Sequence, residues 1–404
     1  MKFFFPDSQD QIDPTFDFDR EASSPDRVRQ RDDRYAHEVI SPPPYSGVLL
    51  SKALIDGPGR YTFAQRHRLF RLGVREFFRL DDATGDRLET MGDCGAFNYV
   101  HEDEPPYSVD DVFDFYEECG FDYGISVDHI ILAYLADSRV EPREEWKARQ
   151  DLTLEYAAQF FRRHKREQPH FVPLGVAQGW DPASYAHSVR RLQRIGYRYI
   201  ALGGMVPLKT PQILACLDAI ARVRKPETRL HLLGITRTER VNEFSRYGVA
   251  SIDSTSPFQQ SFKDDRDNYH TLERNYVAVR VMQIDGNQRL KRRILAGELD
   301  QNEGRRLERA CLASLTAYDE GKASLEATLN TLDAYHAFLG DSPQRATCEE
   351  TLSAQPWKSC PCEVCADVGI HVVIFRGTER NKRRGFHNLH VFNRRLQEEL
   401  ATVA

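Results

Sequence analysis

Eight short apolar segments lie before residue 256, and amphipathic segments with helical spacing separate them. Strands that alternate with helices pair in parallel, and eight such units close into a barrel. Nearly all side chains of these segments are apolar, as in strands that are covered on both faces. Charged helical segments and a cysteine cluster follow. The sequence therefore predicts an α/β fold, a (β/α)8 TIM barrel with a C-terminal helical and zinc-binding subdomain.

The predicted strands recur along the first part of the chain. They are the segments 3–5, 47–51, 89–97, 123–128, 171–178, 199–203, 230–234 and 249–253. Residues 184–195 and 211–223 are intervening segments in which apolar residues recur at helical spacing.

The chain after the eighth strand has few β-branched runs. Long helices are expected between residues 269 and 339, and a last helix over 387–400. We expect three parts, which are a catalytic (β/α)8 barrel over 1–258, a helical region over 259–345, and a zinc-binding subdomain with the last barrel helix over 346–404.

Several predicted strands end in polar residues or glycine. Asp93, Asp128 and Asp253 stand at three of these ends, and Gln178 and the pair Gly203-Gly204 stand at two others. The C-terminal ends of barrel strands line the active site. One aspartate alone would be explained as a helix N-cap or a turn residue. Acids at three strand ends argue against coincidence and indicate a catalytic site.

A tight cluster of cysteines near the C-terminus has the spacing of a metal site. Cys360, Cys362 and Cys365 are followed by His387, and together they supply the four ligands of a closed tetrahedral zinc site. Three thiolates and one imidazole leave no position for water, so one structural Zn²⁺ per chain is expected. His390 is the competing fourth ligand, and the alternatives are reduced surface cysteines or a disulfide.

Charge is distributed unevenly along these 404 residues, whose net charge is -6. Between residues 375 and 396 seven cations face one acid, Glu379, and a second basic run spans 289–293. This asymmetry suggests a face built for polyanions, and the alternative is a solvated helical face.

The sequence also points to a compartment. No apolar run is long enough to span a bilayer, and the apolar start is too short for a signal peptide. The eight cysteines are not spaced as a secreted disulfide framework. We expect a cytoplasmic protein without a membrane partner.

Short motifs occur in a fixed order along the predicted barrel. They are Gly92-Asp93-Cys94-Gly95-Ala96-Phe97, Val127-Asp128, Gly175-Val-Ala-Gln178-Gly179, Ala201-Leu-Gly203-Gly204-Met205, Leu232-Leu233-Gly234 and Ile252-Asp253-Ser254-Thr255-Ser256. With the cysteine cluster and His387-Asn388-Leu389, the chain resembles the guanine-exchanging transglycosylases, the family that contains tRNA-guanine transglycosylase. The resemblance covers most of the chain.

Some motifs depart from the tRNA-acting pattern. Cys94-Gly95-Ala96 replaces Ser-Gly-Gly, Pro257-Phe-Gln-Gln replaces Leu-Pro-Thr-Arg, and no C-terminal RNA-binding domain is recognised. The opening residues 2–9 and the segment 376–387 look most like the DNA-acting branch. The resemblance therefore implies a DNA-guanine transglycosylase that exchanges guanine for a 7-deazaguanine, 7-cyano-7-deazaguanine. The alternatives are a tRNA-guanine transglycosylase, or a non-catalytic zinc protein that binds nucleic acid, which would have no need of buried acids.

Base exchange at one anomeric carbon needs two carboxylates, as in retaining glycosidases. The resemblance assigns Asp253 as the nucleophile that forms a covalent intermediate and Asp93 as the general acid/base. It assigns guanine recognition to a further set, Asp128, Gln178, Gly203, Gly204, Phe97 and Met205, the last two as apolar walls around the extruded base.

The expected partners follow from this chemistry. They are double-stranded DNA, the free 7-deazaguanine base and, by resemblance, an ATPase partner protein, since no P-loop is present. The cations expected to contact DNA phosphates are Arg380, Lys382, Arg383 and Arg384.

Overall fold

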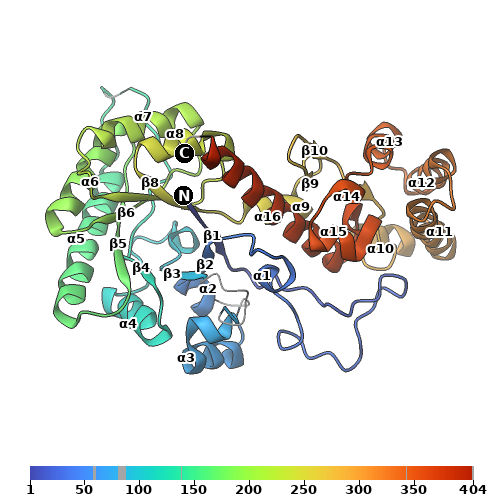
Figure 1. Cartoon of the computed structure of the whole chain (residues 1–404), viewed down its shortest axis with the longest axis horizontal. Coiled ribbons are helices and arrows are strands. Elements are labelled where there is room, and N and C mark those ends of the chain that lie inside the picture. The colour runs from blue at the N-terminus through green and yellow to red at the C-terminus, as the bar shows by residue number, and fades with distance from the viewer. Residues whose placement is uncertain (58–60, 81–87, 138, 343, 403–404) are drawn as a thin grey trace. The chain divides into compact units, whose positions relative to one another are not determined.

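The computed structural model describes residues 1–57, 61–80, 88–137, 139–342 and 344–402. Eight parallel strands form a closed barrel, which β1 completes by pairing with both β2 and β8 (Figure 1). The strands are β1 (Lys2–Pro6), β2 (Gly47–Ser51), β3 (Glu89–Asp93), β4 (Tyr123–Ile125), β5 (Val172–Ala177), β6 (Tyr199–Leu202), β7 (Arg229–Leu232) and β8 (Val249–Asp253). The predicted (β/α)8 fold is confirmed.

Helices follow the strands along the chain. They are α2 (Lys52–Asp56), α3 (Phe63–Phe77), α4 (Val109–Cys119), α5 (Glu144–Glu167), α6 (Pro182–Ile195), α7 (Thr210–Ala221) and α8 (Val241–Arg246). Two strand glycines make room for α4, because a Cβ at Gly92 or Gly124 would lie 2.3 or 2.6 Å from the Tyr116 ring. Within the described residues, no helix is both long and apolar enough to cross a membrane.

The barrel interior is a packed core. Its buried cluster consists of Phe4, Leu49, Met91, Tyr123, Ile125, Leu174, Val176, Tyr199 and Ala201. Such a core fixes the strands rigidly, and therefore fixes the side chains at their carboxyl ends.

Three elements differ from the sequence prediction. The third strand ends at Asp93 and not at Phe97, because Gly95 adopts φ +86° and a 3-10 helix, η1 (Ala96–Tyr99), follows. Residues 269–280 contain the short strands β9 (Tyr269–His270), β10 (Asn275–Tyr276) and β11 (Val279–Arg280), where helix was expected. The last helix, α16 (Gly377–Ala401), begins well before residue 387.

The chain divides into two compact units. The first comprises Met1–Gln9, Tyr45–Thr255 and Leu396–Ala404, and the second comprises Asp10–Pro44 and Ser256–Arg395. The finer division into a helical region and a zinc-binding subdomain stays a prediction.

The second unit is largely helical. Besides α1 (Ala36–Val39) and the first part of α16, it contains α9 (Ser256–Lys263), α10 (Gln288–Leu295), α11 (Gln301–Asp319), α12 (Leu325–Leu339), α13 (Arg345–Ala354), α14 (Pro356–Ser359) and α15 (Glu363–Val368). Helices α11 and α12 pack against one another, and β12 (Ile374–Phe375) pairs with β11 in parallel.

The basic segment at the start of α16 lies inside the second unit. Arg380 and Arg383 are 2% exposed, and Arg384 is fully buried. Arg380 pairs with Glu21, and Arg383 donates to Glu379 at 2.7 Å.

Neutral oxygens hold the remaining cations of this segment. Arg384 donates to the carbonyl oxygens of Ser261, Val372 and Ile374, each at 3.1 Å, and Lys382 donates to that of Gln11 at 2.7 Å. The expectation that Arg380, Lys382, Arg383 and Arg384 form a phosphate-binding strip is therefore wrong. The three arginines are buried, and all four cations already bind groups within the second unit.

Candidate active site and metal centre

Asp93 ends strand β3 and is held by two donors. The parallel register places Ser51 of β2 beside it, and Ser51 Oγ donates to Asp93 Oδ2 at 2.9 Å. The same oxygen accepts from the Gly95 backbone N–H at 2.9 Å. The left-handed turn at Gly95 therefore folds its own amide back onto the strand-end carboxylate.

Asp128 follows strand β4 and is buried. The thiol of Cys94 donates to Asp128 Oδ1 at 3.1 Å, and Gln178 Nε2 donates to Oδ2 at 2.6 Å. The Tyr99 hydroxyl donates to the Asp128 backbone carbonyl at 3.1 Å. One ligating atom from each of Asp93, Cys94 and Asp128 lies within 4.8 Å of the others. The structure thus brings two of the predicted acids into one cluster.

Gln178 and the glycine pair meet beside Asp128. Gln178 Oε1 accepts from the Ile131 backbone N–H at 3.2 Å, which fixes the orientation of the side-chain amide. A Cβ at Gly203 would lie 2.2 Å from Gln178 Nε2, and one at Gly204 would lie 2.3 Å from the Ile131 carbonyl oxygen. Only glycine fits at either position.

Asp253 ends strand β8, which closes the barrel against β1. Its Oδ1 accepts from the Gly234 backbone N–H at 3.0 Å and from His231 Nε2 at 3.1 Å. The residue is 7% exposed. Asp253 therefore occupies a buried position in which one carboxylate oxygen is held by two donors.

The surroundings of Asp128 and Asp93 raise the pKa of both carboxyl groups. Burial raises the pKa of Asp128 to about 7, and the charge of Asp93 adds to the rise. Burial also raises the pKa of Asp93 to about 6, where the Ser51 hydrogen bond opposes the rise and the charge of Asp253 reinforces it. Asp93 can therefore exchange a proton near neutral pH.

The two predicted apolar walls differ in exposure. Phe97 lies in η1 and is 51% exposed, whereas Met205 follows β6 and is fully buried. Their role in stacking on a base stays a prediction.

Sequence reasoning missed several residues that hold the acids. Ser51, Tyr99 and His231 all contact the predicted site, and none belongs to a quoted motif. His231 carried a signal, because it is a polar residue inside the apolar strand β7. Ser51 becomes recognisable only once the register between β2 and β3 is known.

The predicted metal ligands lie together in the second unit. One ligating atom from each of Cys360, Cys362, Cys365 and His387 lies within 4.8 Å of the others. His387 Nδ1 lies 3.5 Å from the sulfurs of Cys360 and Cys362 and 3.3 Å from that of Cys365. Tetrahedral zinc bonds of normal length would separate nitrogen and sulfur by about 3.6 Å, so this donor set could hold a metal ion.

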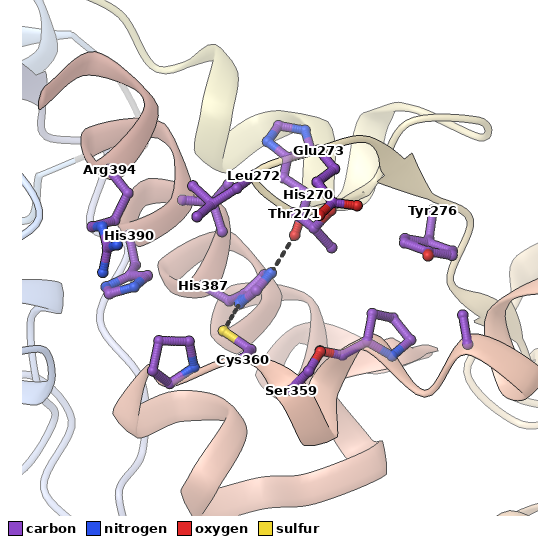
Figure 2. Close-up of a pocket in the computed structure, with 14 residues that line it drawn as sticks. His270, Thr271, Leu272, Glu273, Tyr276, Ser359, Cys360, His387, His390 and Arg394 are labelled. Carbon is purple, nitrogen blue, oxygen red and sulfur yellow. Dashed lines mark hydrogen bonds between the residues drawn. The ribbon is translucent and has the colours of Figure 1, made fainter. Parts of the chain in front are cut away.

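His387 is oriented from its other ring nitrogen. Nε2 donates to the His270 carbonyl at 2.7 Å, which leaves Nδ1 as the ligating atom (Figure 2). The Tyr269 ring stacks on the imidazole with centroids 4.1 Å apart. His390 lies outside the cluster and lines the neighbouring pocket (Figure 2). The structure therefore places His387, and not His390, beside the three cysteines.

Comparison with known proteins places the chain in a family. No family model matches it. A DNA-guanine transglycosylase of Salmonella montevideo is 50% identical over 413 residues, which span 99% of this chain and 98% of that relative. The chain belongs to the DNA-guanine transglycosylase family. This confirms the family that the order of the strand-end motifs predicted. In this member of the family, the strand-end acids lie on a closed eight-stranded barrel.

The raised pKa of Asp128 predicts a pH-dependent stability. Its pKa rises from an ordinary 3.8 to about 7 on folding, so the folded state binds more protons than the unfolded state between these values. The stability of the wild type should therefore fall as the pH rises through this window. Asp128→Asn removes the buried charge and should raise the melting temperature relative to the wild type at pH 8, with a smaller gain at pH 5.

Asp151→Asn is the matched control, because this aspartate lies exposed on α5. Thermal unfolding at pH 5 and at pH 8 measures the difference in melting temperature between each variant and the wild type. A gain for Asp128→Asn that is the same at pH 5 and pH 8 would contradict the assigned protonation.

Proposed function

We propose that the chain exchanges guanine in double-stranded DNA for free 7-cyano-7-deazaguanine, through a covalent bond to Asp253. The observation that carries this proposal is the pair of strand-end carboxylates with different environments. Oδ1 of Asp253 accepts from His231 and Gly234, whereas the pKa of Asp93 is raised to about 6. The 50% identical relative, named a DNA-guanine transglycosylase, supports guanine exchange on DNA.

In the first half-reaction, Asp253 Oδ2 attacks C1′ and the bond from C1′ to guanine breaks. The departing base takes a proton from the Asp93 carboxyl group, which becomes a carboxylate. In the second half-reaction the incoming base gives a proton to Asp93 and attacks C1′. The aspartyl ester bond breaks, and both carboxyl groups return to their starting states.

Recognition of the base would use the cluster around Asp128. Its carboxylate can accept from N1–H and the 2-amino group of guanine, and the Gln178 amide and the Gly204 N–H can donate to O6. Phe97 and Met205 would enclose the ring of the extruded base. The two donors that Asp128 now accepts from, Cys94 and Gln178, show that both of its oxygens face polar partners.

The metal of the cysteine cluster is proposed to be one structural Zn²⁺. Four protein ligands leave no open coordination position, so the ion would stabilise the fold of the second unit and take no part in the reaction.

Two alternatives use the same residues. A tRNA-acting enzyme would share the chemistry and differ in the polymer, where it could read the 2′-OH. A non-catalytic nucleic-acid-binding protein would gain nothing from burying Asp128 and Asp253, whose burial carries a free-energy cost. We keep both as outcomes of the experiments below, in which an ATPase partner protein is added in a separate arm.

The phosphate contacts are assigned to α10, since the segment 380–384 is internal. Arg289, Lys291 and Arg292 are exposed on this helix. Among the described residues, the side chains of these three cations make no hydrogen bond or ion pair, whereas the Arg293 side chain of the same helix binds Glu298. Exposed cations without protein partners are the groups that can replace DNA counterions.

Asp253→Asn should abolish base exchange while leaving DNA binding within about threefold of the wild type. Asparagine keeps an oxygen for His231 and Gly234, but it cannot form the aspartyl ester, so we expect a loss of at least about 10³-fold. Labelled guanine incorporation into duplex DNA and into bulk tRNA, in one buffer, measures both activity and polymer choice. Incorporation of label into tRNA but not into DNA, with the ATPase partner present, would show that the substrate is tRNA and not double-stranded DNA.

Cys362→Ala should release the metal and lower the melting temperature. Apparent zinc-binding energies in small metal sites are about 10–16 kcal/mol, so the local fold depends on the ion. Elemental analysis should give one zinc per wild-type chain and little in the variant. Cys311→Ala, at a buried cysteine outside the cluster, controls for the loss of a thiol. Retention of zinc by Cys362→Ala would exclude this site.

Replacing Arg289, Lys291 and Arg292 together by glutamine should weaken binding to all DNA sequences alike. Each lost phosphate contact reduces the slope of log K against log salt by about 0.9, so the slope should fall by up to about 2.7. Arg384→Met, at the buried cation, should instead lower the melting temperature and leave the slope unchanged. An unchanged slope for the triple variant would remove α10 from the DNA interface.

A further inference from the structure

A chain of buried polar side chains runs through the barrel core to Asp253. The Tyr199 hydroxyl lies 2.5 Å from Ser251 Oγ, and Ser251 Oγ lies 2.5 Å from His231 Nδ1. His231 Nε2 lies 3.1 Å from Asp253 Oδ1. His231 and Ser251 are fully buried, and Tyr199 is 3% exposed. Strands β6, β7 and β8 contribute these side chains, and the β7–β8 register pairs His231 with Ser251 directly.

The hydrogen-bonding capacity of each group fixes the direction of the chain. An ionised Asp253 can only accept, so His231 Nε2 carries a hydrogen and donates to it. Nδ1 of the neutral ring is then an acceptor, and it accepts the single hydroxyl proton of Ser251. Ser251 Oγ in turn accepts from Tyr199, whose pKa is raised to about 12 by burial, so that its hydroxyl stays protonated. Every proton has one acceptor, and the imidazole needs no charge.

Gly234 adds a second donor to the same oxygen of Asp253. Its backbone N–H lies 3.0 Å from Oδ1, the atom that also accepts from His231. Two donors on one oxygen fix the rotation of the carboxylate about its Cβ–Cγ bond. They also stabilise negative charge on the carboxylate, which is the leaving group when the glycosyl ester breaks.

We propose that His231 is a positioning residue that holds Asp253 Oδ1, so that Oδ2 is presented to the sugar carbon, and that Ser251 and Tyr199 fix its tautomer. This inference rests on the proposed role of Asp253 as nucleophile. A neutral imidazole in a fixed tautomer supplies a donor without adding a charge to the dry core, where an isolated charge is costly.

The test compares substitutions at His231 in the guanine-exchange assay on duplex DNA. His231→Leu removes the donor and should lower kcat by about 10²–10³-fold, with KM changed by less than about threefold. His231→Gln keeps a nitrogen donor near the position of Nε2 and should recover at least tenfold of that loss. A purely structural histidine would lower the melting temperature of both variants without this difference in kcat.

If His231→Leu does not fold, two serine variants test the proposal instead. Ser251→Ala removes the partner of Nδ1 and should lower kcat by about tenfold. Ser126→Ala, at an equally buried serine that binds the Val176 N–H, should leave kcat within twofold of the wild type.

The outcomes separate this inference from the proposed function. If the wild type exchanges guanine and His231→Leu has the same kcat, the positioning role alone is overturned. If His231→Leu does not fold, an unchanged kcat for Ser251→Ala has the same meaning. Equal losses in His231→Gln and His231→Leu would do the same. Absence of exchange by the wild type, with the ATPase partner present, would overturn the proposed function and this inference with it.

Discussion

The site depends on three strand-end carboxylates in one barrel, of which Asp128 and Asp253 are buried and Asp93 is half-buried. A buried acid is costly unless donors surround it, and each of these acids obtains its donors from neighbouring strands and loops. Ser51 reaches Asp93 across the β2–β3 register, and Gln178 reaches Asp128 from the end of β5. Because β1 pairs with both β2 and β8, closure of the barrel leaves only one strand between these two strands, which are far apart in sequence. The site therefore exists only when the whole barrel is formed.

The second unit also buries charged side chains, which here are arginines. Some of its internal arginines bind acids, such as Arg380 with Glu21, whereas Arg384 binds only uncharged oxygens. Burial lowers the pKa of Arg384 to about 9, and no carboxylate among the groups it binds offsets this. The buried arginines of this stretch thus hold neighbouring segments of the second unit together. The cations Arg289, Lys291 and Arg292 of α10 differ, because they are exposed.

The sequence predicted the barrel and the strand-end acids well, because both follow from periodic, local patterns. Apolar runs mark the strands, and the position of an aspartate directly after such a run marks the site. The cysteine spacing predicted the cluster that could hold a metal ion for the same reason, since three of its four residues lie within one short segment.

Contacts between distant segments could not be predicted in this way. The basic character of residues 376–384 is visible in the sequence, but their burial against Glu21, Gln11 and Ser261 depends on tertiary structure. The 3-10 helix after Asp93 depends on the backbone angle that Gly95 adopts. His231 looked like one polar residue in a strand until the register with Ser251 connected it to Asp253.

Identification of the residue that becomes bonded to DNA tests the central claim most directly. Protein denatured during exchange on duplex DNA, then digested with nuclease and protease, should yield one peptide carrying a deoxyribose-linked adduct. The account predicts that fragmentation by mass spectrometry places this adduct on Asp253. An adduct on Asp93, or continued exchange without any adduct under conditions that preserve an aspartyl ester, would contradict it.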